Sequence, residues 1–278
     1  MSKKFFLSFL LFFTVVIVLV FTLMDMFESK KKPKTVLKQS EVIKTYRYRK
    51  FSHVKSFYQD IAEDAVKIGV KYNVPPAALL AIAGVESGYG RGYVAHITGN
   101  ILSLGAKSNE AELPALYLPN LKVDNSKILY GSMIEKYEKD ELVWKERPKS
   151  LKKDYRPNSI AGTTKELDFL DKNPTAKKEA NIACLEDFAK LWINKKKKFK
   201  PFVKAREMLD EQVKANGEDI LFDRDINIKF IYMISGKTNS FNYRETWAPK
   251  VTTIMKNTGL IELTKALHVD DKTFSEIW

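Results

Sequence analysis

The sequence has few of the residues that most often build disulfides and metal sites. It contains one cysteine in 278 residues, so no disulfide can form within the chain and a cysteine-based metal site is excluded. That residue, Cys184, stands among apolar neighbours and is expected to pack as a small buried hydrophobe. His53, His96 and His268 are far apart and lack the spacing of metal ligands. We therefore expect no metal and no other cofactor.

Motifs for nucleotides and nucleic acids are also lacking. The chain has no nucleotide-binding glycine loop, no internal repeat, and no helix-turn-helix or zinc-finger spacing. Its net charge of +13 would suit nucleic acid, anionic lipid or an anionic cell envelope. Because the lysines are scattered over most of the chain, they indicate a solvated basic surface, and nucleic acid is not an expected partner.

A long apolar run lies at the N-terminus. Residues 5–24 carry no charge, and as a helix they would cover about 30 Å, the thickness of a bilayer core. The run is longer than the apolar region of a cleaved signal peptide, and no small-x-small cleavage site follows it. We therefore predict a transmembrane signal anchor at residues 1–27, a basic linker at 28–52 and a globular domain at 53–278.

The pattern after residue 53 is mainly helical. Apolar residues at helical spacing predict helices over 54–72, 182–192, 226–234 and 251–267. Residues 77–86 follow two prolines and are apolar nearly all round, as is typical of a helix buried at the centre of a domain. Between 106 and 180 the pattern is weak and prolines are frequent, which indicates a less regular middle lobe. No alternation of strands and helices supports a parallel sheet.

Glu86 stands at the end of that buried helix. Ser87, Gly88 and Gly90 then turn the chain into a polar segment, which predicts that the carboxyl group lies at the edge of a cleft. Burial on the helix side would raise its pKa, because desolvation disfavours the charged form. A carboxyl that keeps its proton near neutral pH can protonate the leaving oxygen of a glycoside. A purely structural glutamate would be slightly unfavourable here, because the helix dipole disfavours negative charge at a C-terminus.

The stretch Ala81–Gly105 resembles a motif of the Bax-type N-acetylglucosaminidases, in which a helix ends in E-S-G-aromatic-G and N-N-L-F-G follows. Residues 86–90 match the first half, and residues 99–102 match the second more loosely. Residues 185–206 are similar to a later helix of the family that carries a D-[YF] pair. The resemblance covers residues 54–105 and 180–265 and leaves the middle lobe unmatched.

Residues 241–255 resemble the C-terminal Y-A-T-D-x-x-W-A-x-K-[IV] pattern of the same family. The pattern is matched at Trp247, Ala248, Lys250 and Val251. Its tyrosine position falls on Phe241 and its aspartate on Arg244, which leaves the tyrosine's role either to Tyr243 or to no residue.

The resemblance implies a lysozyme-like helical core with a cleft, and hydrolysis of the β-1,4 bond after N-acetylglucosamine in peptidoglycan. Glu86 would be the general acid. A base, a nucleophile or the substrate's own acetamido group would act on the opposite face of the sugar. The middle-lobe carboxylates that could serve there are Glu112, Asp124, Glu166 and Asp168. Glu166 is preferred because it precedes the 182–192 helix by a family-like distance.

Four further residues are expected to bind substrate: Tyr89, Asn100, Tyr243 and Trp247. The three aromatic rings combine an apolar face with a polar tip, which suits both sugar stacking and core packing. Asn100 belongs to the second half of the motif. The expected partners are thus peptidoglycan glycan strands and, through the N-terminal helix, the membrane.

The expected chemistry also sets the expected location. Lys3 and Lys4 precede the apolar run and four lysines follow it between residues 30 and 34, a count that favours a cytoplasmic domain by the positive-inside rule. A peptidoglycan hydrolase must instead face the wall. We therefore expect a single-pass inner-membrane protein whose catalytic domain faces the periplasm or cell wall.

Three alternatives remain at this stage. A lytic transglycosylase also places one glutamate after an apolar helix, but its product carries an internal anhydro ring; the G-L-M-Q pattern of such enzymes is replaced here by Asn100-Ile101-Leu102-Ser103. A non-catalytic membrane-anchored scaffold could keep the fold and bind glycan. A nucleic-acid-binding membrane protein is suggested by charge alone.

Overall fold

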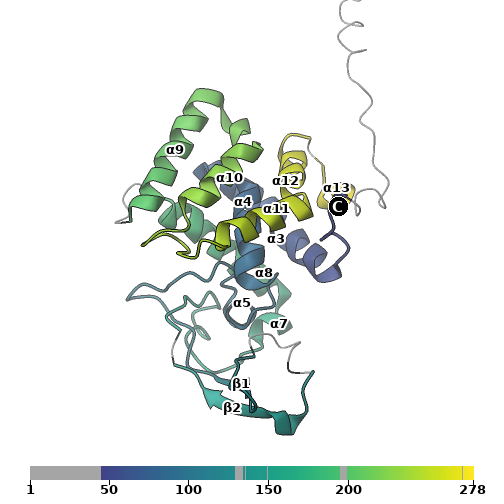
Figure 1. Cartoon of the computed structure of the whole chain (residues 1–278), viewed down its shortest axis with the longest axis vertical. Coiled ribbons are helices and arrows are strands. Elements are labelled where there is room, and N and C mark those ends of the chain that lie inside the picture. The colour runs from purple at the N-terminus through teal and green to yellow at the C-terminus, as the bar shows by residue number, and fades with distance from the viewer. Residues whose placement is uncertain (1–44, 129–133, 135, 149, 195–198, 271) are drawn as a thin grey trace, which may run out of the picture. The chain divides into compact units, whose positions relative to one another are not determined.

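The computed structural model describes residues 45–278, apart from 129–133, 135, 149, 195–198 and 271. The described part is mainly helical, as predicted (Figure 1). The predicted transmembrane run, residues 5–24, lies outside it. None of the helices in the described part is both long and apolar enough to cross a bilayer.

Helix α4 (Pro76–Ser87) forms the centre of the core, as the sequence predicts for residues 77–86. Proline starts it favourably, because the first turn leaves backbone N–H groups unpaired in any case. It ends at Gly88, which has a φ of 56° in the left-handed region that glycine adopts without strain. Every residue from Pro76 to Gly84 is buried, because α4 packs against helices on several sides.

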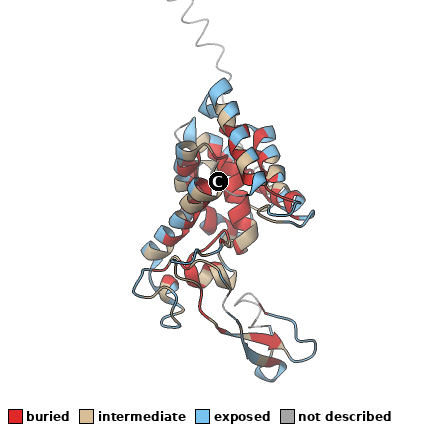
Figure 2. Ribbon diagram, turned by 90° about the vertical axis from the view of Figure 1, so that its left-hand side faces the viewer, coloured by how far each residue is buried: buried red, intermediate tan, exposed pale blue. Residues whose placement is uncertain are grey.

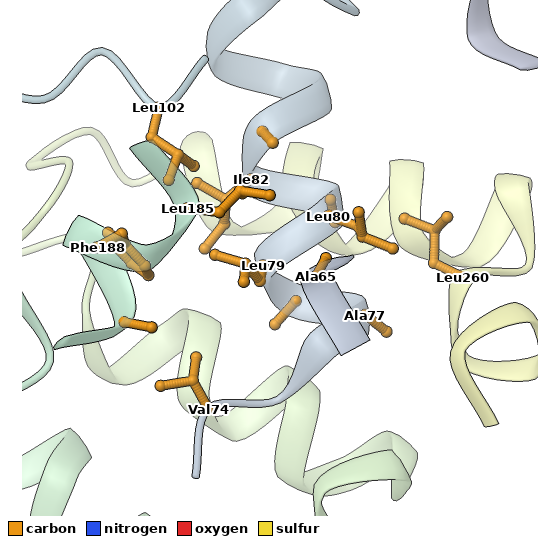
Figure 3. Packing of buried hydrophobic residues seen from close by; sticks show 14 of the residues in the cluster. Ala65, Val74, Ala77, Leu79, Leu80, Ile82, Leu102, Leu185, Phe188 and Leu260 are labelled. Carbon is orange, nitrogen blue, oxygen red and sulfur yellow. The ribbon is translucent and has the colours of Figure 1, made fainter. Parts of the chain in front are cut away.

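Helix α3 (Ser52–Tyr72) agrees with the helix predicted over 54–72 and packs against α4. The two helices share the main apolar cluster, to which α8 and the C-terminal helices also contribute. In Figure 3, Leu79 and Ile82 of α4 point toward Leu185 and Phe188, while Leu80 points toward Leu260. The central helix therefore joins segments far apart in the sequence.

The other helical elements surround this pair or connect to the middle lobe. They are α5 (Tyr93–Thr98), α7 (Phe169–Lys172), α8 (Pro174–Asp187), the π-helical turn η2 (Phe188–Trp192), α9 (Lys200–Asn216), the 3-10 turn η3 (Glu218–Phe222), α10 (Arg224–Met233), α11 (Trp247–Thr258), α12 (Leu260–His268) and α13 (Phe274–Ile277). The predicted 226–234 helix corresponds to α10, and the 182–192 pattern runs from α8 into η2.

The pattern over 251–267 belongs to two helices, α11 and α12. Gly259 separates them with a φ of 68°. A Cβ atom there would lie 2.7 Å from the ring of Tyr46, so the break and its close packing both require glycine. Apolar periodicity continues through the break because both helices bury one face against the same core.

The middle lobe is less regular, as predicted, but it contains a β-hairpin that the sequence patterns did not reveal. Strands β1 (Tyr117–Leu121) and β2 (Leu142–Glu146) are antiparallel, with Tyr117 opposite Glu146 and Leu121 opposite Leu142; the 3-10 turn η1 (Lys139–Glu141) leads into β2. Figure 2 shows far less buried surface here than among the helices. Three residues form a separate small core for the lobe, Ile97, Leu113 and Leu116.

The packed chain begins before the predicted boundary at residue 53. Arg49 is buried, and its guanidinium donates to the carbonyl oxygens of Thr258, Gly259 and Ile277. It also lies over the rings of Tyr46 and Trp278. The last residues of the predicted 28–52 linker are therefore part of the folded domain.

Candidate active site

Glu86 lies in the last turn of α4, where it meets the first residue of α11. The indole Nε1 of Trp247 donates a hydrogen bond of 2.6 Å to Glu86 Oε1. Trp247 is 5% exposed and its ring packs against that of Phe241. Because α4 and α11 pack side by side, the indole is held rigidly and fixes one carboxyl oxygen.

The electrostatic surroundings raise the pKa of Glu86. Desolvation by burial is the largest cause, because it disfavours the charged carboxylate. The hydrogen bond from Trp247 and the positive charges of Lys152, Lys250 and Arg244 act in the opposite direction, and the pKa remains above its ordinary value of 4.5. The site therefore favours a carboxyl that retains its proton longer than an exposed glutamate does.

Glu86 lines a cavity of about 500 Å³ between the helical core and the middle lobe. This size is within the range of small-molecule and sugar-binding sites, roughly 300–1,000 Å³. The lining comes from α4, from the start of α5, from the loop after it and from the hairpin region: Glu86, Gly92, Tyr93, Val94, Ala95, Ser103, Leu118, Lys127, Arg147, Ser150 and Lys152. We call it the Glu86 cavity.

Lys152 enters the Glu86 cavity from residues 151–155, which cross the lobe and which we call the crossing segment. Backbone hydrogen bonds hold this segment on both sides, from Lys153 N to Leu104 O at 3.0 Å and from Leu113 N to Lys152 O at 2.8 Å. The ammonium group donates to the carbonyl oxygen of Ser103 at 2.6 Å. Burial lowers the pKa of Lys152, and the negative charge of Glu86 partly offsets this.

Two non-glycine residues beside Lys152 have left-handed backbone conformations. They are Ser103, with a φ of 57°, and Leu151, with a φ of 56°. Such conformations cost on the order of 1 kcal/mol and persist where the surrounding structure imposes them. Here the crossing segment and the 100–104 loop impose them, and Ser103 is directed into the cavity lining as a result.

The structure brings two predicted site residues together, Glu86 and Trp247. Tyr89 lies near Glu86 in the sequence but does not line the Glu86 cavity. Its ring makes edge contacts with Phe57 and Tyr58 and lies 5.7 Å from the ring of His53. Tyr89 therefore packs among the aromatic side chains of α3, behind the carboxylate.

Asn100 is placed to support the cavity rather than to line it. It is 1% exposed. Its Nδ2 donates to the carbonyl oxygens of Leu104 and Lys153 at 2.8 Å each, and its Oδ1 accepts from Leu104 N at 2.8 Å. These bonds fasten the 100–104 loop to the segment that carries Lys152.

Tyr243 and Glu166 lie away from the Glu86 cavity. Tyr243 is 71% exposed in the loop before α11. Glu166 is exposed in a turn before α7, with a φ of 46°. Asp124 and Asp168 are also exposed, and Glu112 does not line the cavity either. Among the described residues, Glu86 is thus the sole carboxylate of the lining.

Sequence patterns did not identify the lobe residues that face Glu86. Arg147 and Lys152 stand on either side of Pro148 and Ser150, in a stretch whose only visible property is its basic charge. Tyr93 lies between the two matched halves of the motif and Ser103 directly after the second, so neither is a matched position. One signal that could have identified Lys152 is its neighbour Lys153. Successive side chains of an extended segment point to opposite sides, so one lysine of the two could face a cavity.

Lys153 accordingly points away from the cavity. It forms ion pairs with Glu110 at 2.8 Å and Asp187 at 2.5 Å, and Tyr155 donates to Asp187 at 2.9 Å. Asp187 is the acidic member of the predicted D-[YF] pair. The ion pair between Lys153 and Asp187 therefore anchors residues 151–155 to the end of α8. Within the described ranges, no group of three or more His, Cys, Asp and Glu side chains is arranged to hold a metal ion.

No protein-family model matches the chain, and no curated protein matches it. Among solved structures, the fold is similar to the catalytic domain of the autolysin Auto from Listeria monocytogenes. The two share 15% sequence identity with a TM-score of 0.43, over 82% of this chain and 99% of that domain.

Proposed function

We propose that this protein is a membrane-anchored endo-β-N-acetylglucosaminidase that hydrolyses β-1,4 glycosidic bonds of peptidoglycan strands. The observation that supports this most is the carboxyl group of Glu86: it is partly buried, has a raised pKa, is oriented by the Trp247 indole and borders a cavity of about 500 Å³. A proton donor of this kind is what cleavage of a glycosidic bond requires.

In the proposed reaction, protonated Glu86 gives its proton to the glycosidic oxygen while the bond between that oxygen and C1 breaks. The departing sugar leaves with a hydroxyl group. Water then adds to C1 through its oxygen, and its proton returns to Glu86, which restores the acid. Because Trp247 holds Oε1, the other oxygen of Glu86 is left to carry the transferred proton.

On the opposite face, we assign the role of stabilising C1 to the substrate's own acetamido group. Its carbonyl oxygen would bond to C1 as the leaving group departs and would be released when water adds. The proposal is supported by a described lining that offers cations and hydroxyl groups beside the single carboxylate of Glu86. Two displacements at C1 leave the anomeric configuration unchanged, so retention is expected.

Glu86→Gln tests the proposed acid. The amide keeps the size of the side chain and can still accept from Trp247, but it cannot donate a proton. We expect clearing of peptidoglycan in a gel assay by the full-length chain and loss of clearing in the variant, by a factor on the order of 100 or more. Glu179→Gln, at an exposed site on α8, is the matched control. Clearing by Glu86→Gln would contradict the proposal.

The products distinguish the two enzymatic alternatives. A hydrolase leaves a free reducing end, whereas a lytic transglycosylase leaves an anhydro ring that is one water lighter. Mass spectrometry of the digest separates them, and anhydro products would favour the second reading. Binding of glycan without turnover by the unaltered chain would favour the scaffold.

The location follows from the same proposal. The glycan lies outside the cytoplasm, so the domain after residue 45 would face the periplasm or cell wall from an inner-membrane anchor at residues 1–27. A reporter enzyme that is active only outside the cytoplasm, fused after Trp278, should be active. Inactivity of a stably produced fusion would contradict this orientation.

A further inference from the structure

Three cationic side chains line the Glu86 cavity opposite one carboxyl group. They are Lys127, Arg147 and Lys152, which we call the cationic wall. With Glu86 protonated, the described charged side chains of this lining sum to three positive charges; with Glu86 ionised, they sum to two. A neutral glycan carries no negative charge that could pair with these cations.

The three cations converge from separate parts of the lobe. Lys127 follows the turn after β1, Arg147 follows the last residue of β2, and Lys152 lies on the crossing segment. The backbone N of Arg147 donates to Leu116 O at 2.7 Å, and its Nη2 donates to Asn120 Oδ1 at 2.6 Å. The fold, and not adjacency in the sequence, therefore brings the three cationic side chains to one cavity.

Two members of the cationic wall are partly desolvated, and the charge of Glu86 offsets this only in part, at Lys152. Arg147 and Lys152 are half-buried. Across the described part of the chain, neither forms an ion pair with a carboxylate. The Nε of Arg147 is buried without a hydrogen-bond partner among the described atoms. An anion in the cavity could form charge-assisted hydrogen bonds with the terminal nitrogens of these two cations.

We propose that the cationic wall binds a carboxylate substituent of the glycan and so selects acidic strands over neutral N-acetylglucosamine polymers. This inference rests on the proposed function and names its substrate class. In peptidoglycan such a carboxylate can come from the lactyl ether of the sugar or from the attached peptide. Either would lie beside the ring whose bond Glu86 cleaves.

The test compares three substrates with the full-length chain. One is a neutral N-acetylglucosamine oligomer, the second is an alternating strand with free lactyl carboxylates, and the third is the same strand with its peptides attached. We expect kcat/KM to be higher for both acidic strands. In Arg147→Gln and Lys152→Gln this preference should fall about tenfold each, through KM, since a charge-assisted hydrogen bond is worth about that factor.

Arg147 and Lys152 are half-buried, so their variants could misfold. Lys127→Glu tests the same wall without that risk, because Lys127 is exposed and its replacement leaves the core intact. It should lower the preference in the same direction. Lys122→Gln, at an exposed position of the same lobe outside the cavity lining, should leave the preference unchanged. If the peptide-free strand alone shows the preference, the lactyl carboxylate is the ligand; if only the peptide-bearing strand does, it is the peptide.

Failure of this inference differs from failure of the proposed function. Equal kcat/KM on neutral and acidic strands, or a preference unchanged in all three wall variants, overturns the cationic wall while leaving the hydrolase in place. If the unaltered chain cleaves none of the three substrates, the proposed function itself is overturned.

Discussion

The indole Nε1 of Trp247 donates to Oε1 of Glu86 across 161 residues of sequence, at 2.6 Å. This bond joins the last turn of the central helix to the start of α11. It also has two opposing effects on the carboxyl group. It orients the acid, and it lowers a pKa that burial raises.

Trp247→Phe should separate these effects. The ring and most of its packing remain, but the donor is lost, so the pKa of Glu86 should rise further. Because the proposed reaction needs the protonated acid, the alkaline limb of the pH–rate profile should move to higher pH. The value of kcat should fall about tenfold as the acid loses its orientation.

Trp278→Phe is the control for the loss of an indole. Its Nε1 is buried without a hydrogen-bond partner among the described atoms. We expect it to alter stability but not the pH profile. If Trp247→Phe leaves the alkaline limb where it is in the unaltered protein, the indole does not tune Glu86.

Glu86 should make stability depend on pH. Folding raises its pKa, so the folded state binds more protons than the unfolded chain between the ordinary value of 4.5 and the raised value. The stability associated with this group is therefore fully present below the ordinary pKa and is lost as pH rises through the raised one. Glu86→Gln should remove that loss.

We accordingly expect Glu86→Gln to be more stable than the unaltered protein at pH 7, with a smaller difference at pH 4. Urea unfolding at the two pH values measures this. A variant that is destabilised equally at both would show that burial does not penalise the charge.

The close approach of α3 to α4 gives a packing prediction. A Cβ atom on Gly84 would lie 2.5 Å from the hydroxyl of Tyr58 and 3.2 Å from the ring of Tyr89. Gly84→Ala should therefore destabilise the fold by about 1–3 kcal/mol. The Tyr58 hydroxyl is buried without a hydrogen-bond partner among the described atoms, so Tyr58→Phe alone should be neutral or stabilising.

The double variant Gly84→Ala with Tyr58→Phe should recover part of the loss, because removing the hydroxyl opens the space that the methyl group needs. Thermal unfolding of the four proteins gives the coupling. Strict additivity would mean that the two groups do not compete for the same space.

The sequence predicted α3, α4 and the position of Glu86 at the edge of a cavity because each follows from a local pattern. Helical periodicity and flanking turn residues are properties of short stretches. The placement of Lys152 in the same cavity lining as Glu86, by contrast, depends on how residues 151–155 cross the lobe, held by backbone bonds that any residue can make. The hairpin was missed because β1 contains a proline and both strands are short.

Asn100 shows that a position in a local motif does not by itself reveal what the side chain contacts. Its position in the matched motif suggested contact with substrate, but its amide satisfies three backbone groups of two loops. Asn100→Ala should cost roughly 3 kcal/mol of stability, because buried backbone groups lose their partners. Unfolding in urea measures the loss. An Asn100→Ala protein with unchanged stability and raised KM would instead indicate a binding role.

The guanidinium of Arg49 gives the domain a mechanical property. It grips the carbonyl oxygens of Thr258 and Gly259, at the end of α11 opposite to Trp247, and that of Ile277 near the C-terminus. A pull on the backbone at the start of the domain would therefore reach the end of α11 through these carbonyls and through the bond from Tyr48 N to Asn257 O. The load would reach the helix that orients the acid at its far end, leaving the carboxyl group itself unstretched.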